Sequence, residues 1–181
     1  MYETLFKSTI VSFSSYSFTP LALAVFLTGW IILAIGILVL IREKASRESL
    51  LFFLITLAIL IWLCPNSLMY ASPNEQMALG WSRLSFIGVS FIPSAFFQFT
   101  IFALRTSRSN QKRARFGWIV SFFFSILALT SDKFYSGMKQ YAWGYYPRYT
   151  WIGIPFLIFF FFMVLSSFRQ YYQKNQQATS D

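Results

Sequence analysis

Five long runs of apolar residues dominate this sequence and leave little choice of fold. A helix needs about 20 predominantly apolar residues to cross a bilayer, and each run meets or approaches that length. The runs are Pro20–Ile41, Ser49–Tyr70, the stretch between Arg83 and Arg105, Ala114–Ser131 and Tyr149–Phe168. They are continuously apolar and lack the alternation that marks a membrane β-barrel. We therefore expect an all-α fold, a polytopic bundle of five transmembrane helices.

The composition also favours a membrane protein. Only 12% of the 181 residues are charged, whereas a soluble domain carries about 25%. The chain has one cysteine and no histidine, which excludes Ser-His and Cys-His catalysis, His-ligated metals and a phosphoacceptor histidine within it. No Asp, Glu or Lys lies inside a run away from its ends, so no acid–base site is expected within the bilayer. We expect a protein without enzymatic activity, cofactor or metal.

The uneven distribution of lysine and arginine between the loops predicts the orientation. Four basic residues, Lys7, Lys133, Lys139 and Arg148, fall on one side of the expected bundle. Ten fall on the other side: Arg42, Lys44, Arg47, Arg105, Arg108, Lys112, Arg113, Arg115, Arg169 and Lys174. Because basic loops tend to stay in the cytoplasm, we expect an external N-terminus and a cytoplasmic C-terminus. These charges favour contact with anionic lipid over contact with nucleic acid.

This topology divides the chain into three segments. They are an external N-terminal segment, 1–19, a five-helix transmembrane domain, 20–172, and a polar cytoplasmic tail or linker, 173–181. The first segment does not read as a cleavable signal peptide, because Glu3 and Lys7 lie in an aromatic and Ser-rich stretch and the apolar run that follows is long enough to span. We expect that run to remain as an anchor.

The third run contains the most informative polar residues. At about 100° per residue, one helical face holds Arg83, Ser90, Ser94 and Gln98, with phenylalanines opposite. We expect this face to point into the bundle. It either permits close helix packing, which we favour because small polar residues are common at helix interfaces, or lines a ligand cavity. Pro93 predicts a kink that is either a hinge or only a feature of shape.

Two charged residues are expected at the same outer depth. Arg83 begins the third run and Asp132 ends the fourth, so an ion pair between them is geometrically allowed. Two alternatives stay open. Both side chains could reach water independently, or Glu75 in the preceding loop could take the arginine.

Aromatic residues gather in the loop between the fourth and fifth runs. They include Trp143, Tyr145 and Tyr146, with Lys139 and Arg148 among them. Tryptophan and tyrosine commonly anchor membrane proteins at the lipid–water interface, and we favour that interpretation. The alternative is that these rings form the floor of a pocket for an apolar or anionic ligand.

Two motifs resemble a known family. The segment W-S-R-L-S-F-I-G-V-S-F-I-P-S-A-F-F-Q-F is similar to the third-helix region of the N-terminal seven-transmembrane sensor module of bacterial histidine kinases. The matching positions are Trp81, Arg83, Leu84, Gly88 and Pro93, and a second likeness is W-G-Y-Y-P at Trp143–Pro147. The resemblance covers most of residues 20–170 but shows five spans rather than seven and no output domain. The chain is thus either a fragment or a short relative, and the family implies sensing of a ligand or of the membrane state.

From this resemblance we expect a sensory module of the bacterial inner membrane that passes a signal to a cytoplasmic effector. The mechanism would be a shift between two helix packings. A second hypothesis is a non-enzymatic membrane subunit that binds or scaffolds a partner protein. A third is a small-solute transporter, which the absence of ionisable residues inside the spans weakens. The expected partners are the lipid bilayer and an effector or membrane protein, with a homodimer as a further option.

The predicted topology can be tested with reporter fusions on either side of the fourth run. A fusion after Asn110 should be active in the cytoplasm, and one after Lys139 should be active outside, because the run between them spans the membrane. Green fluorescent protein and alkaline phosphatase measure the two locations. Two fusions that report the same side would show that the fourth span is wrong.

Overall fold

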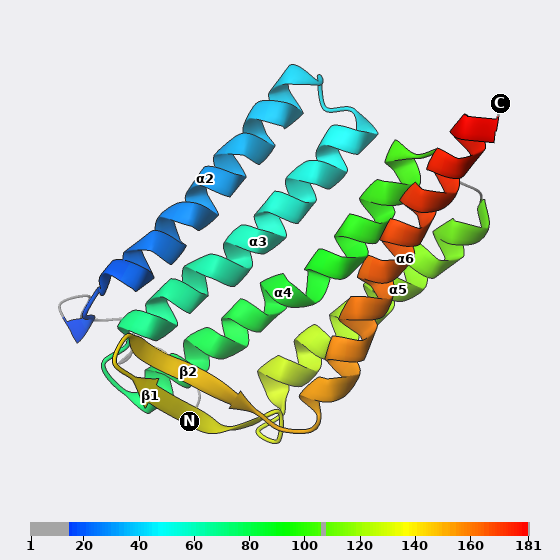
Figure 1. Cartoon of the computed structure of the whole chain (residues 1–181). Coiled ribbons are helices and arrows are strands. Elements are labelled where there is room, and N and C mark those ends of the chain that lie inside the picture. The colour runs from blue at the N-terminus through cyan, green and yellow to red at the C-terminus, as the bar shows by residue number, and fades with distance from the viewer. Residues whose placement is uncertain (1–14, 106–107, 181) are drawn as a thin grey trace.

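Five long helices form a bundle in the computed structural model, which describes residues 15–105 and 108–180 (Figure 1). They are α2 (Pro20–Arg42), α3 (Arg47–Ala71), α4 (Glu75–Ala103), α5 (Arg108–Thr130) and α6 (Gly153–Ser180). Each is long and apolar enough to cross a membrane, which confirms the five predicted spans. Successive helices run in opposite directions. The predicted external segment lies outside the described residues as far as position 14, as does residue 181.

Three helix boundaries differ from the limits of the apolar runs. Helix α4 begins about two turns before Arg83, because the side chain of Asn74 caps its first turn. Helix α6 continues to Ser180, so the predicted polar tail or linker is helical as far as that residue. Conversely, Tyr149 lies in a strand rather than at the start of the fifth span. Apolarity therefore located the spans but not the ends of the helices.

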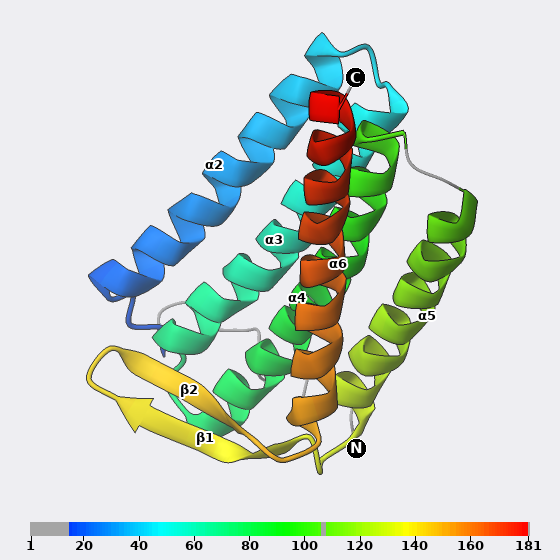
Figure 2. The same cartoon turned by 45° about the vertical axis from the view of Figure 1, so that its right-hand side comes forward.

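A β-hairpin that the sequence analysis did not predict connects α5 to α6. Strands β1 (Tyr135–Tyr141) and β2 (Gly144–Tyr149) pair antiparallel in a two-stranded sheet. Gly144 has a φ of 134°, which favours glycine. The all-α class holds for the bundle, and the hairpin lies across the ends of α3 and α4 (Figures 1 and 2). Aromatic residues favour strands as well as membrane interfaces, which explains why their density was interpreted only as anchoring.

Helix α4 is the central element of the bundle. It contacts α3, α5, α6 and both strands, whereas α2 packs chiefly on α3. A larger share of its span is buried than in any other helix. The helices α2, α3 and α4 form one row, and α5 and α6 lie beyond α4 (Figures 1 and 2). The position of every other part of the bundle therefore depends on α4.

Glycine allows the closest approaches between helices. A Cβ atom at Gly88 of α4 would overlap backbone atoms of Trp62 and Ala58 in α3. A Cβ atom at Gly117 of α5 would meet the side chain of Met163 in α6. A side chain can rotate away, but a helix backbone cannot move without displacing the whole helix. The contact at Gly88 is therefore the less tolerant of the two.

We expect Gly88→Ala to destabilise the bundle by about 1–3 kcal/mol, because the added methyl group forces α3 and α4 apart. The control is Gly80→Ala in the same helix, where an added Cβ has no neighbour within 4 Å. This control should unfold at the same point or slightly later, since alanine favours helices over glycine. Unfolding in a mild detergent measures both variants. Equal stability of the two would contradict the close contact.

Candidate functional site

The predicted site residues lie mostly at one end of the bundle. We call this the hairpin end, because it carries β1 and β2, and the opposite end the basic end. The basic end carries the α2–α3 and α4–α5 connections and the C-terminus of α6 (Figure 1). All ten basic residues grouped together in the sequence analysis belong to the basic end. The two ends therefore differ strongly in charge.

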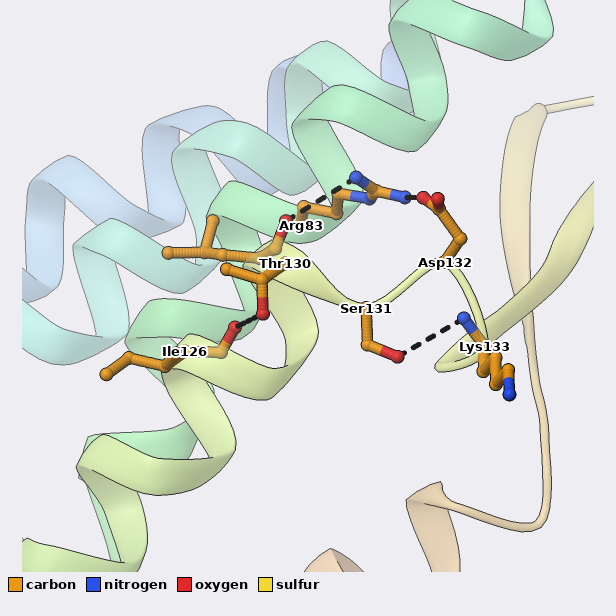
Figure 3. A network of polar contacts seen from close by, with 7 residues as sticks. Arg83, Ile126, Thr130, Ser131, Asp132 and Lys133 are labelled. Carbon is orange, nitrogen blue, oxygen red and sulfur yellow. Dashed lines mark hydrogen bonds and ion pairs between the residues drawn. The ribbon is translucent and has the colours of Figure 1, made fainter.

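The predicted ion pair between Arg83 and Asp132 is present at the hairpin end. Arg83 Nη2 lies 2.6 Å from Asp132 Oδ1, and Arg83 Nη1 donates to the Leu129 carbonyl at 3.4 Å (Figure 3). The side chain of Arg83 is 23% exposed and that of Asp132 is 89% exposed. The arginine thus reaches from α4 to the end of α5. Because the carboxylate is largely hydrated, the pair contributes little to stability.

Glu75 does not take the arginine, so that alternative is wrong. Its Oε1 atom instead accepts a hydrogen bond of 2.9 Å from the backbone N–H of Met138 in β1. The hydroxyl of Tyr135, also in β1, donates to the carbonyl of Ser82 at 3.4 Å. Burial raises the pKa of Tyr135 well above its usual range, so the ring stays neutral. Strand β1 is therefore tied to the first turns of α4 at two points.

Trp143 fixes the tip of the hairpin against two other helices. Its ring stacks on Tyr141, with centroids 5.0 Å apart, and meets the ring of Tyr70 at the end of α3 edge-on, at 5.2 Å. Its carbonyl accepts a bond of 3.5 Å from the hydroxyl of Thr19, the residue that caps α2. Trp143 therefore holds the hairpin against α3 and the start of α2, and its ligand role stays a prediction.

The other two predicted aromatic site residues differ in burial: Tyr145 is packed and Tyr146 is exposed. Tyr145 packs against a small buried cluster of Met69, Ala78 and Met138. Tyr146 is 43% exposed and is paired with Lys139 across the sheet. Neither residue lines the two pockets described below. Tyr145 therefore has a packing role inside the protein, and interfacial anchoring and a ligand role both stay predictions for these two residues.

A buried aromatic cluster that the sequence analysis missed lies beneath the hairpin. Phe134, just before β1, is fully buried, and its ring centroid lies 4.7 Å from that of Phe86 in α4. Phe86 lies at the same distance from Phe156 in the first turn of α6. Phe124 of α5 completes the cluster, 5.5 Å from Phe156. With phenylalanine so abundant in this chain, no local pattern distinguishes these four rings from those that face lipid.

The polar stripe on α4 faces the interior, as predicted. Ser90 and Ser94 are fully buried. The hydroxyl of Ser94 bonds to that of Ser121 in α5 at 2.8 Å, and the Gln98 side chain accepts a hydrogen bond from the Trp118 indole. These contacts join α4 to α5 and support the packing interpretation. Pro93 is buried between these residues, and its role as a hinge stays a prediction.

Two pockets lie at the basic end. The larger, about 490 Å³, is lined by Val39, Glu43, Ser46, Glu48, Ser49, Phe52, Phe99 and Arg105. The smaller, about 310 Å³, is lined by Arg47, Gln98, Ile101, Phe102, Gln111, Ala114, Arg115 and Trp118. Of the predicted site residues, Gln98 alone reaches either pocket. Over residues 15–105 and 108–180, no three His, Cys, Asp or Glu side chains gather as a metal site would require.

The fold defines a polytopic helical membrane protein with a hairpin across one end. Comparison with known families makes the assignment specific: residues 24–179 match the N-terminal 7TM region of histidine kinase. The match covers most of the chain, which therefore belongs to this family. The family's description names seven spans, and the described residues contain five. No curated protein and no solved structure matches the chain significantly.

A double-mutant cycle with Arg83→Gln and Asp132→Asn tests the ion pair. We expect a coupling free energy of about 0.2–1 kcal/mol, because one partner is well exposed to water. Unfolding in detergent provides the four stabilities. The coupling should shrink at about 1 M salt, where the screening length falls to about 3 Å. A coupling of zero, or one of the 3–5 kcal/mol typical of a broken buried pair, would contradict this description.

Proposed function

We propose that this chain is a non-catalytic sensory region that receives a signal at the hairpin end and passes it to a cytoplasmic effector at the basic end. Membership of the histidine kinase 7TM family supports the sensory role. A series of ring contacts supports the signal path. Phe134, just before the hairpin, contacts Phe86 of α4, and Phe86 contacts Phe156 of α6. A displaced hairpin would therefore press on α4 and, through it, on α6.

Helix α6 is suited to carry such a movement through the membrane. It is one continuous helix of 28 residues, which corresponds to about 42 Å at 1.5 Å per residue. The hydrocarbon core of a bilayer is about 30 Å thick. The helix therefore extends past the membrane at one end, and we propose that an effector contacts this end. Rigid helix shifts of this kind are a common form of signal transmission.

The charge distribution supports an external hairpin. The loops and helix ends at the basic end hold ten lysines and arginines, and the hairpin end holds far fewer. Basic loops favour the cytoplasmic side. We accordingly propose a bacterial inner membrane location, with the N-terminus outside, the C-terminus in the cytoplasm, and the lipid bilayer and an effector as partners.

The scaffold hypothesis has less support. Large apolar side chains such as Leu38, Ile119 and Phe162 are exposed, but they lie within the spans, where lipid covers them. Their exposure therefore does not require a protein partner. A scaffold would also have no need for coupling between the two ends, so a test of coupling distinguishes the two hypotheses.

We expect a displaced hairpin to change the helix arrangement at the basic end. Spin labels at Lys112→Cys in α5 and Lys174→Cys in α6, with Cys64 replaced, report the distance between these helices in lipid nanodiscs. Gly144→Val displaces the hairpin, because a side chain there would overlap the backbone of Tyr70. The distance should shift by about 1–2 Å, as in other helix movements.

The control for this experiment is Gly80→Ala, which has open space around it and should leave the distance unchanged. Faster tryptic cleavage at Lys139 shows that the hairpin has moved in the Gly144→Val variant. A moved hairpin with an unchanged distance would contradict the sensory proposal and favour a scaffold.

A further inference from the structure

The smaller pocket at the basic end combines two arginines with apolar side chains. Arg47 is the first residue of α3, and Arg115 lies in the second turn of α5. The only ion pair among the described residues is that of Arg83 with Asp132, so neither guanidinium group has a carboxylate partner there. The acidic residues nearby, Glu43 and Glu48, line the other pocket. The smaller pocket is therefore a site of uncompensated positive charge.

The remaining polar lining offers further hydrogen-bond donors. The Gln98 oxygen accepts from the Trp118 indole, which leaves the Gln98 amide nitrogen available to donate. Gln111 is exposed on the same side. Arginine side chains bind phosphate through paired hydrogen bonds, and amide donors supplement them. The chemistry of the pocket thus suits a phosphate group.

The apolar lining of the pocket and its position at the end of the α4 span indicate that the phosphate belongs to a lipid. Ile101 and Phe102 lie in the last turn of the α4 span, beside the two arginines. The volume of about 310 Å³ is small for a ligand site and suits a headgroup rather than a whole lipid. Acyl chains would lie outside it, along the exposed side chains of Phe116 and Ile119 on α5. A phospholipid matches this surface, because its charged headgroup would lie in the pocket and its apolar chains would lie along α5.

We propose that this pocket binds the phosphate headgroup of an anionic phospholipid, which bridges α3 and α5. These two helices make no extensive contact of their own in the described part of the chain. Both helices pack on α4, which lies between them (Figure 1). Basic pockets between helices at the cytoplasmic boundary are typical headgroup sites. The bound lipid would hold α5 beside α3 whether or not the chain is a sensor.

Native mass spectrometry of the detergent-purified chain tests this site with added phosphatidylglycerol or phosphatidylcholine. The unmodified chain should bind one phosphatidylglycerol more tightly than phosphatidylcholine. The double variant Arg47→Gln, Arg115→Gln should lose at least about tenfold of the phosphatidylglycerol affinity, because it removes the charge-assisted bonds to phosphate.

The matched control is Lys112→Gln, Arg113→Gln. It removes the same number of charges from exposed positions that do not line the pocket, so it lowers the general attraction to anionic lipid equally. This control should bind phosphatidylglycerol within about threefold of the unmodified chain, a difference well below the tenfold step. An equal loss in both double variants would overturn the proposal, because it would indicate surface charge without a built site.

Two further measurements test whether the ligand binds in the pocket and whether it is a lipid. Gln111→Glu places a carboxylate beside the arginines at an exposed helical position, where it should not affect folding. Both Gln111→Glu and Lys112→Gln lower the net charge by one. Gln111→Glu should nevertheless weaken phosphatidylglycerol binding more. Inorganic phosphate at millimolar concentration should not displace the lipid. Displacement that depends on Arg47 and Arg115 would overturn the lipid as the ligand and point to a soluble anion.

Discussion

The backbone contact between α3 and α4 at Gly88 is the constraint on which the rest of the bundle depends. Lipid is as apolar as the helices, so burial of apolar surface does not drive helices together within a bilayer. Close van der Waals packing must do so, and it requires small residues where two helices meet. Once α4 is seated on α3, it presents its remaining surface to α5, α6 and the hairpin. The positions of α5, α6 and the hairpin depend on this approach, whereas α2 packs on α3 separately.

The polar side chains within the spans hold that arrangement together. Ser67 donates to the Ala22 carbonyl at 2.7 Å and joins α3 to α2, and Ser85 donates to Asn66 at 2.8 Å and joins α4 to α3. The bond between Ser94 and its partner in α5 extends the series. Because these hydroxyls are engaged in packing, the groups with free binding capacity lie at the two ends. In the proposed function, reception would lie at the hairpin end and output at the basic end.

Much of this structure could be predicted from the sequence because the deciding patterns are local. Continuous apolarity located five spans, and helical phase placed Ser90 and Ser94 in the interior. Equal depth at the ends of two spans allowed the pairing of Arg83 with Asp132, and the structure chose it over the two alternatives. The hairpin could not be predicted in this way, since tyrosine and tryptophan serve interfaces and strands alike. The hydrogen bond from the Met138 N–H to Glu75 could not be predicted either, because Met138 lies in that hairpin.

The sequence by itself determined the class of protein, the number of spans and the family motif, since each depends on residues that are close in the chain. Tertiary structure alone decided which rings form the cluster around Phe86 and which positive charges share a pocket. Arg47 and Arg115 come from different helices that barely touch, and no periodicity relates them. Their proximity results from the packing of α3 and α5 around α4, because side-chain volume and packing geometry, rather than sequence spacing, set the distance between helices.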